Sequence, residues 1–178
     1  MDTTKQFCQS CSDQSAPEHP IFDLCRANRF HEALAICQRE IAANPNEPAG
    51  YRHAAAVLQR MDRHAEARPF RDKVVELAPD TMSYYSRADL LYEMGDYAAA
   101  IPDFTRSAEL DHEQALGAAN FLYRADCHRR LGNFAEAVAD CARVPDNFDF
   151  PGFLGHRNGS KHHLLAEIAR ERNLPRSS

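Results

Sequence analysis

Small and apolar residues recur along this chain at the spacing of an α-helix, and whole blocks of the pattern then repeat. One block reads YYSRADLLYEMGDYAAAIPDF over residues 84–104, and a later one reads FLYRADCHRRLGNFAEAVADC over residues 121–141. Each block opens on an aromatic residue, places Ala four residues on, reaches a Gly, and continues with an aromatic residue and another Ala. A repeat of about 34 residues has the length of one helical hairpin. No run of alternating apolar residues indicates a strand, so the pattern predicts an all-α chain.

Four kinds of position mark the repeat in phase along the chain. Alanine returns where two helices are expected to cross, at separations of 34, 33 and 37 residues, as Ala33, Ala67, Ala100 and Ala137. Three residues before each Ala stands a ring-bearing side chain: Phe30, His64, Tyr97 or Phe134. Two residues earlier comes a turn residue of a type that tolerates positive φ: Asn28, Asp62, Gly95 or Gly132. The first helix has its own small position, at Ala55, Ala88 and Ala125, with Ile21 as the exception.

These residues resemble the tetratricopeptide repeat, a pair of antiparallel helices. The resemblance covers residues 14 to about 145, in copies at about 14–47, 48–81, 81–114 and 118–145. It implies a right-handed solenoid of about four helical hairpins, which is the fold class that we expect.

Several prolines depart from the repeat pattern. Pro69 and Pro102 each fall two residues after the crossing Ala of a second helix, where a proline removes one backbone hydrogen bond. We therefore expect these second helices to start late or to bend. Pro17 and Pro20 are expected to shorten the first helix of the first copy.

The two ends of the chain lack the repeat. Residues 1–13 are polar and aperiodic, so we expect a flexible tail. Residues 146–178 are expected to form a Phe-rich loop, which folds back over the last repeat, and a helix over 160–173 with Ser160 as its N-cap. An apolar stripe along this helix predicts a cap on the open end of the solenoid; the alternative is a detachable helix that binds a partner. The residues of the loop and the stripe are Phe148, Phe150 and Phe153, then Leu164, Leu165, Ile168 and Leu174.

Composition and charge narrow the function further. The 178 residues carry a formal net charge of −5, which argues against general binding to nucleic acid or to anionic membranes. No apolar segment reaches the length of a membrane span, and the first residues do not resemble a signal peptide. Six cysteines in such a chain suggest reduced thiols and a cytoplasmic location. Four of them are expected to be small buried side chains within helices: Cys25, Cys37, Cys127 and Cys141.

Candidate chemistry is sparse. Cys8 and Cys11 form a CxxC, but a zinc site needs a second pair of ligands, so we interpret them as tail thiols. His162 and His163 are adjacent on a predicted helix and point in directions about 100° apart, which makes them a poor chelating pair. We expect no metal, no cofactor and no catalytic residue, and hence a protein that is not an enzyme. A metal- or thiol-dependent enzyme is kept as an unlikely alternative.

The resemblance also implies a binding groove, lined in this family by the first helix of each hairpin. Carried over by position, the candidate groove residues are Arg52, Gln59 and Arg60 from the second copy, Tyr85, Asp89, Tyr92 and Glu93 from the third, and Leu122, Asp126, Arg129 and Arg130 from the fourth. The alternative is an ordinary solvated face with internal ion pairs, such as Arg52 or Arg129 with Asp89 or Asp126. Some relatives clamp the C-terminal carboxylate of chaperone partners with Lys and Asn; at those positions this chain has Glu18, Phe22 and His53, which disfavours that role.

The function that we expect is therefore a non-catalytic scaffold or adaptor that takes a segment of a protein partner in its concave groove. A small secretion-type chaperone of the same repeat family is the first alternative, and it would need a more apolar groove. The oligomeric state, the partner's identity and any role for Cys8 and Cys11 are left open by the sequence.

Overall fold

The computed structural model describes residues 20–112, 116–148 and 161–173. Within these ranges the chain forms α-helices and no β-strand, which confirms the all-α fold class. The expectations for the tail 1–13, for Cys8, Cys11 and Pro17, and for Phe150, Phe153, Ser160 and Leu174 lie outside the described residues. The helices in order are α1 (Pro20–Arg26), α2 (Phe30–Ala43), α3 (Pro48–Arg60), α4 (His64–Leu77), α5 (Thr81–Glu93), α6 (Tyr97–Leu110), α7 (Gly117–Arg130), α8 (Phe134–Ala142) and α9 (Lys161–Arg172).

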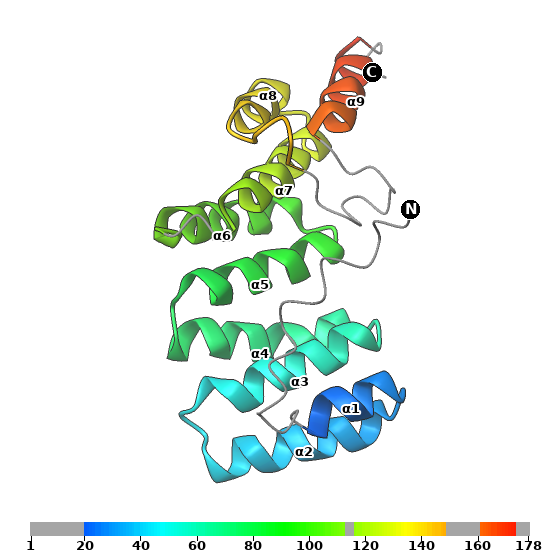
Figure 1. The fold of residues 1–178 in the computed structure, drawn as a ribbon, viewed down its shortest axis with the longest axis vertical. Helices are drawn as coiled ribbons and strands as arrows, with labels where there is room; N and C mark the ends of the chain where they lie inside the picture. Colours follow the sequence, from blue (N-terminus) through cyan, green and yellow to red (C-terminus); the bar gives the residue numbers. More distant parts are fainter. Residues whose placement is uncertain (1–19, 113–115, 149–160, 174–178) are drawn as a thin grey trace, which may run out of the picture.

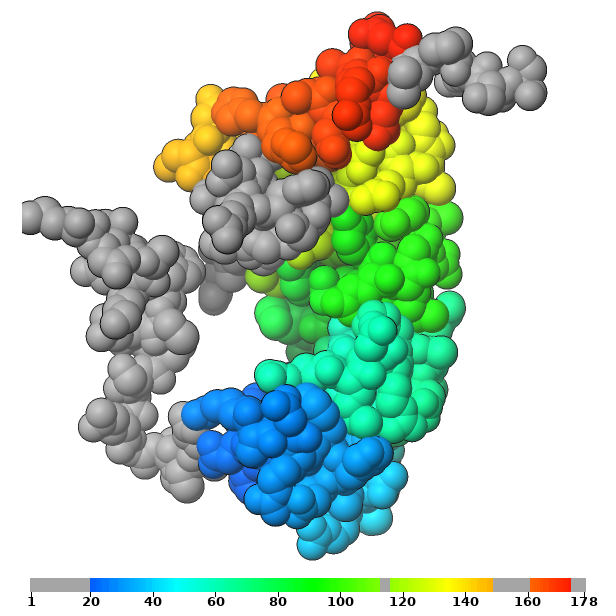
Figure 2. Space-filling model, turned by 90° about the vertical axis from the view of Figure 1, so that its right-hand side faces the viewer, coloured from blue at the N-terminus to red at the C-terminus, as the bar shows by residue number. Residues whose placement is uncertain are grey.

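Eight of these helices form four successive hairpins, which stack along one axis from α1–α2 to α7–α8, with α9 beyond the last one (Figure 1). Each hairpin packs against the next through its second helix, as α2 does against α3 and α6 against α7. The stack is curved, with a hollow on one side (Figure 2). The two views together place the first helices, α1, α3, α5 and α7, on the hollow side. The architecture is therefore a helical repeat solenoid.

The hairpin turns follow the sequence pattern. Asn28 and Asp62 have positive φ of 56° and 60°, and Gly95 and Gly132 both have φ of 77°. Glycine adopts this region without a Cβ clash, and Asn and Asp are the side chains that tolerate it best. The four predicted turn positions are confirmed.

The predicted small positions are the places where helices approach most closely. The crossing alanines are fully buried, as are the small residues of the first helices, and Ile21 is 3% exposed. Cys37, Phe104 and Cys141 occupy one repeat position, four residues after the crossing Ala of their copy, and all three are fully buried. The prediction that cysteines serve as small core side chains is confirmed for Cys25, Cys37, Cys127 and Cys141, each of which is a free, buried thiol.

Two expectations concern prolines. α4 and α6 begin at His64 and Tyr97, in the same register as Phe30 in α2, and run through Pro69 and Pro102. The prediction of a late start is therefore wrong. Both prolines lie on exposed faces. Water can therefore donate a hydrogen bond to the backbone carbonyl that would otherwise accept one from the N–H that proline lacks. α1 is described over Pro20–Arg26, so the predicted shortening by Pro17 and Pro20 concerns a boundary that the described residues do not test.

Each of the last two hairpins contains an ion pair between its two helices, which the sequence pattern did not predict. Arg87 in α5 donates to both oxygens of Asp103 in α6, at 2.6 and 2.8 Å. Arg124 in α7 makes the equivalent two-point contact with Asp140 in α8. Both aspartates are nearly buried, so each pair joins the two helices of its hairpin in a protected setting.

The C-terminal helix covers the open end of the last hairpin. Leu164 and Ile168 of α9 are buried in one cluster with Leu122, Ala137 and Val144, whereas Leu165 is only partly buried. Phe148 packs against the same cluster, as expected for the loop that follows the last repeat. No helix in the described ranges is long and apolar enough to cross a membrane.

Candidate functional site

The first helices of successive hairpins are connected by side chains, and we call the surface that they form on the hollow side of the solenoid the inner row. Gln59 in α3 donates a hydrogen bond of 2.9 Å to Glu93 in α5. Tyr92 in α5 donates one of 2.6 Å to Asp126 in α7. Both pairs are separated by 34 residues, so equivalent faces of consecutive first helices lie side by side.

The beginning of the row is held by an arginine. Arg52 donates to Asp80 at 2.8 Å and to the Ser83 hydroxyl at 3.1 Å. Asp80 also accepts the Ser83 backbone N–H at 2.7 Å and so caps the N-terminus of α5. Arg60, at the end of α3, is exposed and makes no hydrogen bond or ion pair with the other described residues.

Five polar side chains meet in the middle of the row: Gln59, His64, Arg71, Asp89 and Glu93. The Gln59 carbonyl accepts two hydrogen bonds from Arg71, of 3.0 and 2.6 Å. His64 Nε2 lies 3.5 Å from a Glu93 oxygen. No hydrogen bond from the described residues reaches Asp89. Burial, and then the nearby charge of Glu93, raise the pKa of Asp89 to about 6 from the ordinary 3.8.

Tyrosines from two hairpins adjoin this polar group. The Tyr123 ring of α7 stands edge-on to Tyr85 and Tyr92 of α5, with centroids 6.2 and 5.2 Å apart. Tyr123 also stacks on the buried Phe104 ring at 5.5 Å. All three tyrosines are partly buried, and burial is the main cause that raises the pKa of each hydroxyl, so they stay neutral donors.

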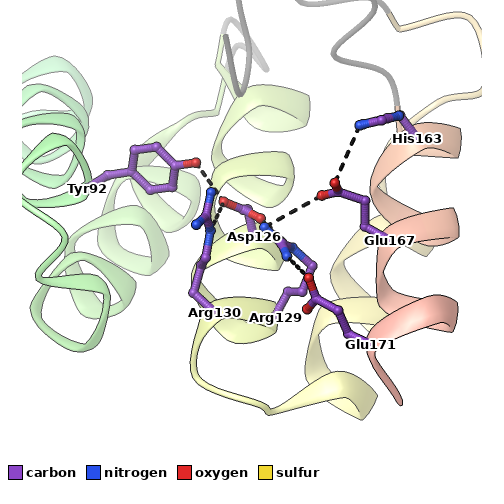
Figure 3. Close-up of polar contacts among 7 residues, drawn as sticks. All are labelled: Tyr92, Asp126, Arg129, Arg130, His163, Glu167 and Glu171. Atoms are coloured by element: carbon purple, nitrogen blue, oxygen red, sulfur yellow. Dashed lines mark hydrogen bonds and ion pairs between the residues drawn. The ribbon is translucent and has the colours of Figure 1, made fainter. Parts of the chain in front are cut away.

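The end of the row is occupied by an ionic network that reaches α9 (Figure 3). Asp126 is fully buried and accepts hydrogen bonds from Tyr92, from Arg129 at 2.7 Å and from Arg130 at 3.3 Å. Arg129 is 7% exposed. It also donates to Glu171 of α9 and lies 3.6 Å from Glu167. Asp126 and Arg129 thus tie α7 to α5 and α9.

The remaining groove candidates are more open. The Arg130 side chain is 43% exposed and lies over the Tyr97 ring, 5.6 Å from its centroid. Leu122 is fully buried in the core of the last hairpin. Of the internal ion pairs considered from the sequence, Arg129 with Asp126 is present, while Arg52 pairs with Asp80.

Sequence reasoning missed three participants. His64 and Arg71 belong to α4, a second helix, and the positions carried over came only from first helices. Tyr123 lies in α7 at a position that was not among those carried over from the repeat family. Its aromatic side chain within a repeat helix could have marked it as a candidate. No sequence signal marked Arg71, because its role comes from its contact with Gln59 on the neighbouring helix.

The thiols and the metal-ligating residues give no second site within the described ranges. Burial raises the pKa of Cys37 and Cys127 to about 12 and that of Cys141 to about 11, so these three side chains remain protonated at neutral pH. No group of three or more His, Cys, Asp or Glu side chains in the described part of the chain is arranged to hold a metal ion.

A hollow of about 550 Å³ lies away from this row, between α6, α7 and the segment after α8. Its walls include Phe121, Phe148 and Arg143, whose guanidinium lies 3.7 Å from the centroid of the Phe121 ring. This cation already occupies the ring face. The inner row is therefore the better defined surface.

Comparison with known proteins agrees with this geometry. Residues 85–150 match the family model of the tetratricopeptide repeat. Human tetratricopeptide repeat protein 13 is 29% identical over 60% of this chain, and a TPR repeat-containing protein from Methanocaldococcus jannaschii is 22% identical over 61% of it. The matched segments span 13% and 20% of those two proteins.

Among solved structures, YrrB, described as a TPR protein with an unusual peptide-binding site, superimposes with a TM-score of 0.68 at 19% identity. The superposition covers 86% of this chain and 75% of YrrB. At this level of identity the likeness concerns the fold. The stacked hairpins, the family model that matches residues 85–150 and these relatives together show that the chain is similar to tetratricopeptide repeat proteins.

Proposed function

We propose that the chain is a non-catalytic adaptor that binds an extended or helical segment of a protein partner along the inner row. The tetratricopeptide repeat fold is in general a scaffold for protein–protein interaction. The observation that carries the proposal is the set of side-chain hydrogen bonds that connect α3 to α5 and α5 to α7, through Gln59 with Glu93 and Tyr92 with Asp126.

The chemistry of the row suits recognition. Tyrosine offers a large contact surface with few rotatable bonds, and arginine offers a planar set of donors, so both residue types are enriched where partners bind most strongly. Tyr85 and Tyr92 are held in place by Tyr123, which lowers the entropy lost on binding. The proposed contact residues are Arg52, Gln59, Arg60, Tyr85, Asp89, Tyr92, Glu93 and Arg130.

Asp126 and Arg129 have a supporting part in this proposal. Because both are buried, they act by positioning Tyr92, Arg130 and α9 rather than by reaching the partner. The structural relative YrrB, which is described as having a peptide-binding site, adds support from a chain of similar fold.

The test begins with a pull-down from native lysate, followed by mass spectrometry, to identify a partner. Calorimetry then compares the wild type with Arg60→Glu on the inner row and with Arg106→Glu on α6. Both arginines are exposed, so neither change leaves a core cavity. We expect Arg60→Glu to change affinity in a manner that weakens with salt, because an exposed charge acts through a screened field. We expect Arg106→Glu to have no effect.

A partner that binds Arg60→Glu, Tyr85→Ala and the wild type with equal affinity would place the interface elsewhere. An effect of Arg106→Glu alone would place it on the outer helices.

A further inference from the structure

Asp89 is an unpaired acceptor near the middle of the inner row. Its side chain is largely withdrawn from solvent, yet no hydrogen bond from the described residues reaches it. Among the described residues, some buried side-chain polar atoms lack a hydrogen-bond partner, and the Asp89 oxygens are not in that group. Because these oxygens also lack a partner there, they are accessible to solvent. A carboxylate can accept several hydrogen bonds, and this one is open to a donor from outside the chain.

Charged groups of both signs face Asp89, and none of those described donates a hydrogen bond to it. Glu93, one turn further along α5, repels it. Arg71 and His64 of α4 attract it, but Arg71 is held by two hydrogen bonds to Gln59. His64 lies 3.5 Å from both Glu93 and Asp62. The middle of the row therefore presents two neighbouring carboxylates: Glu93 lies near His64, and Asp89 accepts no hydrogen bond from the described residues.

Aromatic rings border the same carboxylate. Tyr85 and Tyr123 lie close enough to Asp89 for its charge to raise the pKa of their hydroxyls. Aromatic rings attract cations, and the aliphatic stems of Lys and Arg pack well on them. Arg130 of α7 takes such a position against Tyr97 of α6, so a contact of this kind already exists within the chain.

We infer that the inner row recognises a lysine or arginine of its partner segment, with the cationic group against Asp89 and Glu93 and the stem along Tyr85 and Tyr123. This inference rests on the proposed function and specifies the chemistry of the partner. The occupant is a basic peptide segment, because a cation complements two neighbouring carboxylates of which Asp89 has free acceptor positions.

Proton binding at Asp89 is linked to this contact. A cation binds the ionised form, and with a pKa of about 6 that form is roughly a tenth of the total at pH 5 and about nine-tenths at pH 7. Affinity should therefore be about tenfold weaker at pH 5 than at pH 7. The other titratable or charged groups that face Asp89 are Glu93, Arg71, His64, Tyr85 and Tyr123, so the link is tested with Asp89 itself changed.

The experiment selects peptides from a displayed random library on the full chain at pH 7. Amide resonances of α3 and α5 then identify the peptides that bind at the inner row. We expect these peptides to share a Lys or Arg that selection on Asp89→Asn does not enrich. Glu109→Gln is the matched control, since it makes the same carboxylate-to-amide change at an exposed position of α6. It should select the same peptides as the wild type.

A selected lysine peptide and its norleucine analogue are then compared by calorimetry. The lysine peptide should bind the wild type about tenfold more tightly than it binds Asp89→Asn, and only the wild type should lose affinity at pH 5. The norleucine peptide should bind both proteins equally. If Asp89→Asn has a lower melting temperature than the wild type, the comparison is repeated with Asp89→Ser.

Two kinds of result distinguish failure of this inference from failure of the proposed function. Inner-row peptides without a shared basic residue, or a pH effect that persists in Asp89→Asn, overturn this inference and leave the proposed function standing. A library that yields no peptide at the inner row overturns both.

Discussion

At the scale of single residues, the ionised form of Asp89 opposes folding. Ionising a carboxyl group that is largely removed from water and lies beside Glu93 raises the free energy of the folded state. Side chains that keep such a charge at an unfavourable position are common at functional sites. The free energy of unfolding should therefore report the state of this group directly.

Replacing Asp89 by Asn should stabilise the protein at neutral pH. The pKa of Asp89 is about 6 in the folded chain against the ordinary 3.8, so the wild type loses stability as pH rises from about 4 to about 6 and keeps that loss above it. Two pKa units correspond to about 2–3 kcal/mol, which Asp89→Asn should recover at pH 7. Near pH 4.5 the increase in the free energy of unfolding caused by Asp89→Asn should be about a third of its value at pH 7. Urea denaturation at both pH values measures this, and an equal effect at the two values would contradict it.

Asn120 gives a second residue-scale test. It is 1% exposed, and among the described residues neither its amide nitrogen nor its amide oxygen has a hydrogen-bond partner. Leucine has a similar shape and no polar atom, so Asn120→Leu should raise the free energy of unfolding by about 1–2 kcal/mol. Asn120→Ala, which leaves a cavity, serves as the comparison. Destabilisation by the leucine would show that the amide is satisfied by a bound water.

At the scale of elements, the hairpins join their two helices in two different ways. The third and fourth hairpins join their helices through Arg87 with Asp103 and Arg124 with Asp140. In the second hairpin the equivalent positions hold Ala54 and Phe70, where Ala54 is buried and Phe70 packs against core residues. The repeat thus keeps its backbone geometry while it exchanges an ion pair for an apolar contact.

This exchange predicts the effect of breaking and replacing the ion pair. Asp140→Ala leaves the mostly buried Arg124 without its partner, which should lower the free energy of unfolding by roughly 3–5 kcal/mol. The double change Arg124→Ala with Asp140→Phe installs the pair found in the second hairpin and should recover most of that loss. Chemical denaturation of both variants measures it. A double variant no more stable than Asp140→Ala would show that the ion pair has a geometry that the apolar pair cannot replace.

At the scale of the whole molecule, a solenoid must cover the apolar face of its last repeat. Leu164 and Ile168 of α9 provide that cover, and Arg129 adds ionic contacts with Glu167 and Glu171. The same arginine contacts Asp126, which also binds Tyr92, so the cap and the inner row share one polar network. α9 therefore supports both the core and the candidate site.

Deleting residues 160–178 should expose the cluster around Leu122, Ala137 and Val144 and promote aggregation. Leu164→Ala in the full chain should lower the free energy of unfolding by about 2–5 kcal/mol, with Leu165→Ala the milder control, because Leu165 is only partly buried. Size-exclusion chromatography and thermal melting measure these effects. A truncated chain that stays monomeric with an unchanged melting temperature would show that α9 is detachable.

The sequence by itself determined the features that depend on short-range geometry. Positive φ at Asn28 and Gly132 and burial of Ala67 follow from what those residue types allow within one hairpin, and the repeat then fixes the stacking. The positions carried over from the repeat also led to the inner row, since equivalent faces of consecutive first helices must align.

Only the tertiary structure decided how charges in that row are used. Arg129 pairs with Glu171 of α9, Arg71 donates to Gln59 from a second helix, and Asp89 accepts no hydrogen bond from the part of the chain that the structure describes. These outcomes depend on side chains far apart in sequence competing for the same partners, and on how much water each site retains. A repeat pattern carries neither kind of information, because it records which position a residue occupies and not which of several neighbours its side chain will bind.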